Sequence, residues 1–304
     1  MSTQSNAMSD SFQSQSIAPA VIPATRVFYW SIRRELWENR SLYLAPLAVA
    51  AVALLGFSLS VIAGIWEKPL RLNPAHPQVP FDMAAGLLML TGIVVSVFYC
   101  LDALHGERRD RSILFWKSLP VSDLTTVLSK ASIPLVVLPL LTFAITVAMQ
   151  WLMLLVSSAV VLASGLSVSA LWTNLSFPRM SLLLLYHLLT AHALWPFPIY
   201  CWLLLVSGWA RRAAFLWAVL PLVAIAGVEQ IVFHTWHFAT LVGSRLIGDA
   251  PTVAATSPDM FPTNPMTHII PGQFLTSPSL WIGLAFAAAC IAAAVQLRRS
   301  REPI

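Results

Sequence analysis

Long uninterrupted apolar blocks are the feature that most limits what this chain can fold into. A helix needs about 20 residues to cross a hydrocarbon core of roughly 30 Å. Six blocks approach or exceed that length, at residues 42–66, 83–104, 132–161, 181–207, 213–235 and 279–297. Only 10% of the 304 residues are charged, whereas a soluble domain carries roughly 25%. The sequence therefore predicts an all-α membrane protein with six transmembrane helices, and it excludes a soluble enzyme and a disordered chain.

The distribution of Lys and Arg predicts the orientation of these helices. With the N terminus placed inside, 14 of the 18 basic residues fall in the inner segments and four fall in the outer ones. Inner loops of membrane proteins are enriched in Lys and Arg, so both termini are expected to be cytoplasmic. The formal net charge of +5 is then explained by basic residues at the helix ends, and no nucleic-acid partner is expected.

Two regions with different compositions precede the first apolar block. Residues 1–24 are rich in Ser, Gln and Ala and are predicted to form a disordered cytoplasmic tail. Residues 25–41 combine Trp30 and Trp37 with four Arg, a composition typical of a helix that lies at a membrane surface. We therefore expect an interfacial amphipathic helix here, with a plain cytosolic extension of the first span as the alternative.

The rest of the chain is predicted to be one membrane domain, residues 42–297, followed by a cytoplasmic tail at 298–304. The longest outer loop, residues 236–278, is rich in Pro, Thr and Gly, and it either forms short interfacial helices or links two spans across the surface. The third block, 132–161, is longer than a bilayer requires. It is expected to tilt, to kink at a proline, or to project beyond the membrane.

The cysteines give no sign of a cofactor or a disulfide framework. Cys100, Cys201 and Cys290 are each isolated inside an apolar block, so no CxxC pair is present. We expect them to be small packing residues. No cofactor is predicted for the chain.

The most informative stretch is the inner connection between the second and third blocks, residues 105–130, with the sequence HGERRDRSILFWKSLPVSDLTTVLSK. It begins with a dense charge cluster, continues into an aromatic and apolar turn, and breaks at Pro120. A helix is expected to restart there because Ser122 is a good N-cap and Asp123 suits the positive end of a helix. Exposed Phe and Trp beside charge favour a docking surface for a soluble partner. An amphipathic loop packed on lipid headgroups is the alternative.

Part of this connection resembles a known signature. The string GERRDRSILFWKSLPVSD, residues 106–123, is similar to the inner-loop signature of the ABC-2 type permease family, the membrane subunits of bacterial ATP-binding-cassette transporters. The matching elements are Glu107 with Arg108, Ser112–Phe115, Ser118–Pro120 and Ser122 with Asp123. Outside the connection the resemblance extends only to the topology of an amphipathic helix and six spans with both ends cytoplasmic.

The resemblance implies a transport subunit in a bacterial inner membrane, which moves a substrate, by expectation outward, with a separate ATP-binding-cassette ATPase. Phe115 and Trp116 would fill a groove of that ATPase, with Glu107, Arg108 and Arg109 at its rim. The full set of implied coupling residues is Glu107, Arg108, Arg109, Asp110, Ser112, Phe115, Trp116, Ser118, Leu119 and Pro120. No GxxxxGK[ST] motif occurs, so the chain is not expected to hydrolyse ATP itself. The resemblance also implies a second permease chain, either identical or related.

Within the apolar blocks, ionisable residues are candidates for function by default. Glu229 is the one acid placed well inside a block, and it either lines a translocation path, holds a dimer contact, or lies near the outer interface. His234 and His237 are three residues apart, but without a third fixed ligand or an HExxH motif no metal site is predicted. His187 and His192 would diverge by about 140° around an α-helix and are not expected to form a pair.

Two other classes of function stay open from the sequence alone. An intramembrane enzyme would use polar groups of the fourth and fifth blocks, but it should show paired Asp, Ser with His, or HExxH in facing spans. A membrane accessory or sensor protein would use the same docking surface without transport. The membrane lipid is a partner in every case.

Overall fold

The computed structural model describes most of the predicted membrane domain and both ends of the predicted inner connection. The described residues are 23–63, 79–110, 121–163, 165, 167–169, 172, 177–247, 253–254, 268–269 and 271–300. The predicted tail at 1–24 lies almost wholly outside the described residues. The middle of the inner connection, residues 111–120, lies wholly outside them.

The described part of the chain is predominantly helical, as the sequence predicts. Its helices are α1 Ala24–Glu38, α2 Ser41–Ile62, α4 Val79–Asp102, α5 His105–Arg109, α7 Asp123–Ser132, α8 Leu138–Ala163, α10 Phe177–His187, α11 Phe197–Trp209, α12 Ala214–Phe233, α13 His237–Ile247, α14 Pro271–Thr276 and α15 Pro278–Ser300, with π-helices η1 Ile133–Val137 and η2 Leu188–Leu194. Two two-residue strands, β1 Val253–Ala254 and β2 His268–Ile269, pair antiparallel. This small pairing lies within residues 236–278, the predicted outer loop, and departs from a purely all-α fold.

Among the described residues, five helices are suited to a membrane, or six if one bent pair is a single span. The five segments are Ser41–Ile62, Val79–Arg109, Asp123–Ala163, Ala214–Phe233 and Pro278–Ser300. The bent pair is Phe177–Leu194 with Phe197–Trp209, and the bend is 44°. The block predicted at 181–207 therefore forms two helices with a bend between them. The break follows from Pro196 and Pro198, because each lacks the N–H that would continue an α-helix.

The third apolar block, residues 132–161, lies within a helical segment whose length exceeds the thickness of a bilayer. Asp123–Ala163 contains 41 residues, about 60 Å of helix at 1.5 Å per residue. The π-helix η1 contains Pro134 and lets the helix continue past the missing N–H. The helical segment begins before the apolar block, since α7 precedes η1 and α8, and a projection beyond the membrane stays a prediction.

The helix α1 carries its aromatic side chains on an exposed surface. Tyr29, Trp30 and Trp37 are all exposed. The Arg33 guanidinium lies over both indole rings, 5.0 Å from the Trp30 centroid and 4.7 Å from that of Trp37. This arrangement of cation and indoles is the one expected of an interfacial helix, and the membrane location of α1 stays a prediction.

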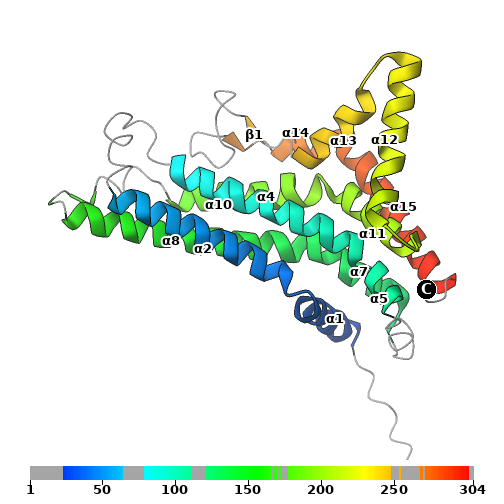
Figure 1. Cartoon of the computed structure of the whole chain (residues 1–304), viewed down its shortest axis with the longest axis horizontal. Helices are drawn as coiled ribbons and strands as arrows, with labels where there is room; N and C mark the ends of the chain where they lie inside the picture. The colour runs from blue at the N-terminus through cyan, green and yellow to red at the C-terminus, as the bar shows by residue number, and fades with distance from the viewer. Residues whose placement is uncertain are drawn as a thin grey trace, which may run out of the picture.

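Two groups of apolar side chains form most of the core. One lies among α4, α11 and α15 and includes Tyr200 and Cys201. The other lies among α2, α4 and α8 and includes Leu88 and Met153. These helices form the elongated body seen in Figure 1. All three cysteines are buried and unpaired, as predicted for packing residues.

The helices α12 and α13 form an arm that stands beside α11 and α15 at the upper right of Figure 1. In the most apolar stretch of α12, only 6% of the residues are buried against the rest of the chain. The residues that flank α12 adopt the left-handed backbone conformation, Ala213 with φ of 51° and His234 with φ of 53°. The outer loop predicted at 236–278 thus contains α13 and α14, which favours short helices over a plain linker.

Candidate functional site at the charged base

One end of the molecule carries a network of charged side chains, which we call the base network. It is formed where α1, α5, α7 and the C-terminal end of α15 meet, at the lower right of Figure 1. Its members are Arg34, Glu35, Tyr99, Glu107, Asp123, Lys130 and Arg298. Residues far apart in the sequence are brought together here.

Glu35 of α1 is the most deeply buried member of the base network, with no exposed surface. Its carboxylate accepts hydrogen bonds from Lys130 Nζ at 2.9 Å, from Arg34 Nη2 at 2.7 Å and from the Tyr99 hydroxyl at 2.9 Å. Burial raises the pKa of Glu35, but the Lys130 ammonium and the Arg34 guanidinium more than offset burial and hold the pKa below its usual value. Glu35 is therefore ionised and fixes α1 against α4 and α7.

Glu107 of α5 is the second buried acid of the base network. One of its oxygens lies 3.1 Å from Lys130 Nζ and 3.2 Å from Arg34 Nη2, and the other accepts from Arg298 Nη1. Arg298 also donates from Nε to Asp123 at 2.9 Å. Arg298 of the last helix thus joins α5, through Glu107, to α7, through Asp123.

The base network sets three acids against three bases, and Arg34 also lies 3.6 Å from the half-exposed Glu38. The acids Glu35, Glu107 and Asp123 face the bases Arg34, Lys130 and Arg298. Removing one partner of a buried pair costs about 3–5 kcal/mol, because the other charge is left without compensation. The network therefore favours one arrangement of α1, α5, α7 and α15, and separating these helices is costly.

Local signals in the sequence explain how α5 and α7 are placed. Ser122 caps α7, and its hydroxyl accepts from Thr125 N at 3.1 Å. The predicted restart of the helix is therefore confirmed. The short helix α5 is held at the C-terminal end of α11, where Arg108 Nη1 donates to the Gly208 carbonyl at 2.7 Å. A cation is favourable at this position because helix C-terminal carbonyls are electronegative.

The implied coupling residues do not share one environment. Glu107 and Arg108 are buried, with 8% and 6% of their surface exposed, so both are engaged inside the chain rather than placed at an exposed rim. Arg109 and Asp110 are exposed and pair with each other at 3.1 Å. The other implied residues, Ser112, Phe115, Trp116, Ser118, Leu119 and Pro120, lie outside the described residues.

Several members of the base network were not singled out from the sequence. Glu35 lies within the amphipathic stretch predicted at 25–41, where Ile32 and Leu36, on the same side of α1, pack against the core. The position of Glu35 on the same helix face as these two apolar residues was the sequence signal that could have indicated its burial. Arg298 was assigned to a tail at 298–304, whereas residues 298–300 belong to α15. No local pattern pairs Arg298 with Glu107, which is 191 residues away.

Glu229 has a local structural role at the start of α13. Its Oε1 accepts from Thr235 Oγ1 and from His237 N, both at 2.8 Å, and its Oε2 accepts from Phe238 N at 2.8 Å. The carboxylate therefore caps the N-terminus of α13, where negative charge is favoured. This geometry tests none of the three options left by the sequence, and they stay predictions.

The histidines are placed differently from the sequence expectation. The rings of His187 and His192 lie 5.1 Å apart between centroids, so the predicted divergence is wrong. The cause is η2, because a π-helix hydrogen-bonds residues five apart and brings them onto adjacent turns. Within the described ranges, no group of three or more His, Cys, Asp or Glu side chains is suited to a metal ion.

The fold and the base network define a predominantly helical protein whose long apolar helices are suited to a membrane. Comparison with family models, curated proteins and solved structures finds no match for the chain. The inference of function therefore depends on the base network and on the connection that it holds.

Proposed function

We propose that this chain is the membrane subunit of an ATP-binding-cassette transporter, a permease of the ABC-2 type in a bacterial inner membrane. A separate ATPase binds and hydrolyses ATP, and the permease moves a substrate, by family expectation outward. Two permease chains, identical or related, work with two ATPases. The resemblance of residues 106–123 to the family signature supports this choice of class.

The observation that carries the proposal is how the base network holds both flanks of residues 111–120. The helix α5 precedes this segment and α7 follows it. Glu107 of α5 and Lys130 of α7 pair at 3.1 Å, and both acids that contact Lys130 also contact Arg34 of α1. A force applied to residues 111–120 therefore acts on α1, α7 and α15 together.

This arrangement suits a coupling element because it transmits displacement instead of absorbing it. The helix α7 continues through η1 into α8, so a shift of α7 reaches the apolar part of the chain along one helical segment. The last helix, α15, is packed along α11 and is joined to the same network by Arg298. In the proposal, closure of the two ATPases pushes the connection, and the attached helices tilt.

Photo-crosslinking tests the docking half of the proposal. A photoreactive amino acid is placed at Trp116 in the full-length chain, in membranes of cells that also express the ATPase from the neighbouring reading frame. We expect an adduct with a protein whose peptides include a Walker A motif. A probe at Phe286, an exposed residue of α15, is the control and should give lipid adducts only. Lipid adducts from both positions would show headgroup packing and would refute the docking.

A truncation measures the strength of this contact. Aromatic anchors at interfaces commonly contribute about 2 kcal/mol, so Trp116→Ala should weaken ATPase binding by about 30-fold. Unchanged co-purification of the ATPase with both Trp116→Ala and Phe115→Ala would contradict the proposal.

Two neighbouring arginines test the second part of the proposal, that the base network transmits motion from the ATPase to the helices. Arg298 is buried in the base network, whereas its neighbour Arg299 is exposed. Arg298→Gln should leave docking intact but abolish the effect of the permease on ATP hydrolysis, because α15 is no longer joined to Glu107. Arg299→Gln should behave as wild type. Equal effects of the two substitutions would remove the base network from coupling.

A further inference from the structure

A second feature, remote from the base network, is a cavity between the arm and the body of the molecule. Its volume is about 630 Å³, and four helices line it: α11, α12, α13 and α15. Small-molecule sites commonly have volumes of about 300–1,000 Å³. The space is therefore large enough for an organic ligand.

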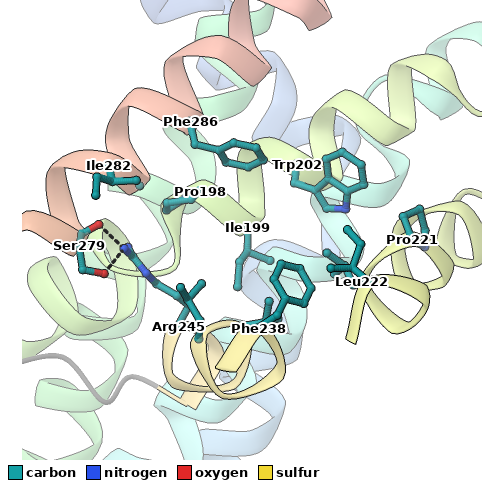
Figure 2. A pocket seen from close by; sticks show the side chains of 14 residues that line it. Pro198, Ile199, Trp202, Pro221, Leu222, Phe238, Arg245, Ser279, Ile282 and Phe286 are labelled. Atoms are coloured by element: carbon teal, nitrogen blue, oxygen red, sulfur yellow. Dashed lines mark hydrogen bonds between the residues drawn. The ribbon is translucent and has the colours of Figure 1, made fainter. Parts of the chain in front are cut away.

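The walls of the cavity are almost wholly apolar. Ile199 and Trp202 of α11 face Leu222 of α12 and Phe238 of α13, with Phe286 of α15 above them in Figure 2. The Trp202 indole N–H is satisfied, since it donates to the Ala218 carbonyl at 3.2 Å. Such a surface recognises hydrocarbon and offers no hydrogen bonds along most of its length.

One cation lies at the edge of this apolar space. The Arg245 guanidinium donates to the Trp195 carbonyl at 2.9 Å and to both the carbonyl and the hydroxyl of Ser279, as the dashed lines in Figure 2 show for Ser279. It also lies 4.1 Å from the centroid of the Trp195 ring. All of these partners are neutral.

Arg245 is a buried charge without an opposite charge among the described residues. Only 5% of its surface is exposed, and no described carboxylate forms an ion pair with it. The acid of the arm, Glu229, is already bound to the first turn of α13. A buried cation is stabilised strongly by an anion that hydrogen-bonds to it.

The position of Arg245 is specified by the packing around it. A Cβ atom at Gly283 would lie 2.8 Å from Arg245 Nη1 and 2.9 Å from Nη2, so only glycine leaves room for the guanidinium. The N-terminus of α15, at Pro278, is at the same end of the cavity and adds to the positive potential. The planar fork and the helix end together favour an oxyanion.

We propose that this cavity binds an anionic phospholipid of the membrane, with an aliphatic chain between α11 and α12 and the phosphate at Arg245. The observations that carry the assignment are the apolar walls, the volume and the single buried cation at the edge. The lateral setting among apolar helices makes the bilayer itself the source of the ligand. The site does not depend on the proposed transport function, since lipid binding needs no ATPase.

Native mass spectrometry of the full-length chain in detergent tests the proposal. Phosphatidylglycerol and diacylglycerol, which has the same acyl chains but lacks the phosphate, are titrated in parallel, and bound lipids are counted. Wild type should bind phosphatidylglycerol about tenfold more tightly, a typical gain for a charge-assisted hydrogen bond. Arg245→Gln should abolish this preference, and Arg245→Lys should retain part of it.

Two further variants separate the cavity from general effects. Arg179 is an exposed cation of α10 that does not line the cavity, so Arg179→Gln should leave the preference unchanged. Val242→Phe fills the cavity from α13 and should weaken binding of both lipids while Arg245 is kept. Equal binding of the two lipids by wild type would overturn the proposal, as would unchanged lipid binding by Val242→Phe. Dimers that form without bound lipid and are lost in Val242→Phe would also overturn it and identify a second copy as the occupant.

Discussion

Lys130→Met is the substitution that most directly tests the energetics of the base network. Methionine keeps most of the length of the side chain but removes the ammonium, which lies 2.9 Å from Glu35 and 3.1 Å from Glu107. Both carboxylates are buried, and among the described residues Arg34 and Arg298 still pair with them. Loss of one partner from a buried pair costs about 3–5 kcal/mol, so we expect the free energy of unfolding near neutral pH to fall by that amount.

The pH dependence of this loss gives a signature that simple loss of packing would not. In the wild type, the pKa of Glu35 is below its usual value because Lys130 and Arg34 more than offset the effect of burial. A lowered pKa stabilises the fold above the unfolded value of about 4.3, and this contribution is lost as the pH falls through the folded pKa. Without Lys130, we expect burial to dominate and to raise the pKa of Glu35. Acidification toward about pH 4.3 should therefore restore stability to the variant, whereas the wild type should lose this contribution only below that pH.

The assay is thermal and denaturant unfolding of the purified chain in detergent, followed from pH 8 down to pH 3 for each protein. Arg109→Met is the matched control, because Arg109 and Asp110 form an exposed pair. Exposed pairs contribute about 0–1 kcal/mol. The reasoning is refuted if Lys130→Met and Arg109→Met lose similar stability, or if acidification lowers the stability of Lys130→Met as it does that of the wild type.

Three other predictions concern the arm and the lipid cavity. Glu229→Gln should speed hydrogen exchange of the Phe238 amide about tenfold, because an amide nitrogen would replace the oxygen that accepts from it; unchanged exchange would exclude the cap. Gly283→Ala should reduce unfolding stability by about 1–3 kcal/mol by displacing Arg245, whereas Gly227→Ala, with open space at its Cβ, should not destabilise; similar losses would contradict the packing argument. Ala213→Gly should raise the melting temperature through a gain of about 1 kcal/mol, because glycine adopts the left-handed conformation without the steric cost of Cβ; a lower melting temperature would disprove this.

The features that the sequence predicted are those that depend on local composition and spacing. Long apolar blocks predicted the long helices, and Ser122 predicted the start of α7, because each signal lies within one turn or one span. The base network was missed because its members come from opposite ends of the chain, and each looks like an ordinary charge beside a span. The contact between His187 and His192 was missed for a different reason. A periodicity of 3.6 residues was assumed where the chain forms a π-helix, and this changes which side chains face each other.

The left-handed residues that begin and end α12 also bear on how the fold can diverge. Ala213 and His234 turn the chain sharply at each end of a helix that has little contact with the body. The direction of the arm therefore depends mainly on the backbone conformations of Ala213 and His234 and on the Glu229 cap of α13. Substitutions at these two residues could change the direction of the arm during evolution. Such changes would alter the shape of the lipid cavity while the packed helices and the base network stay as they are.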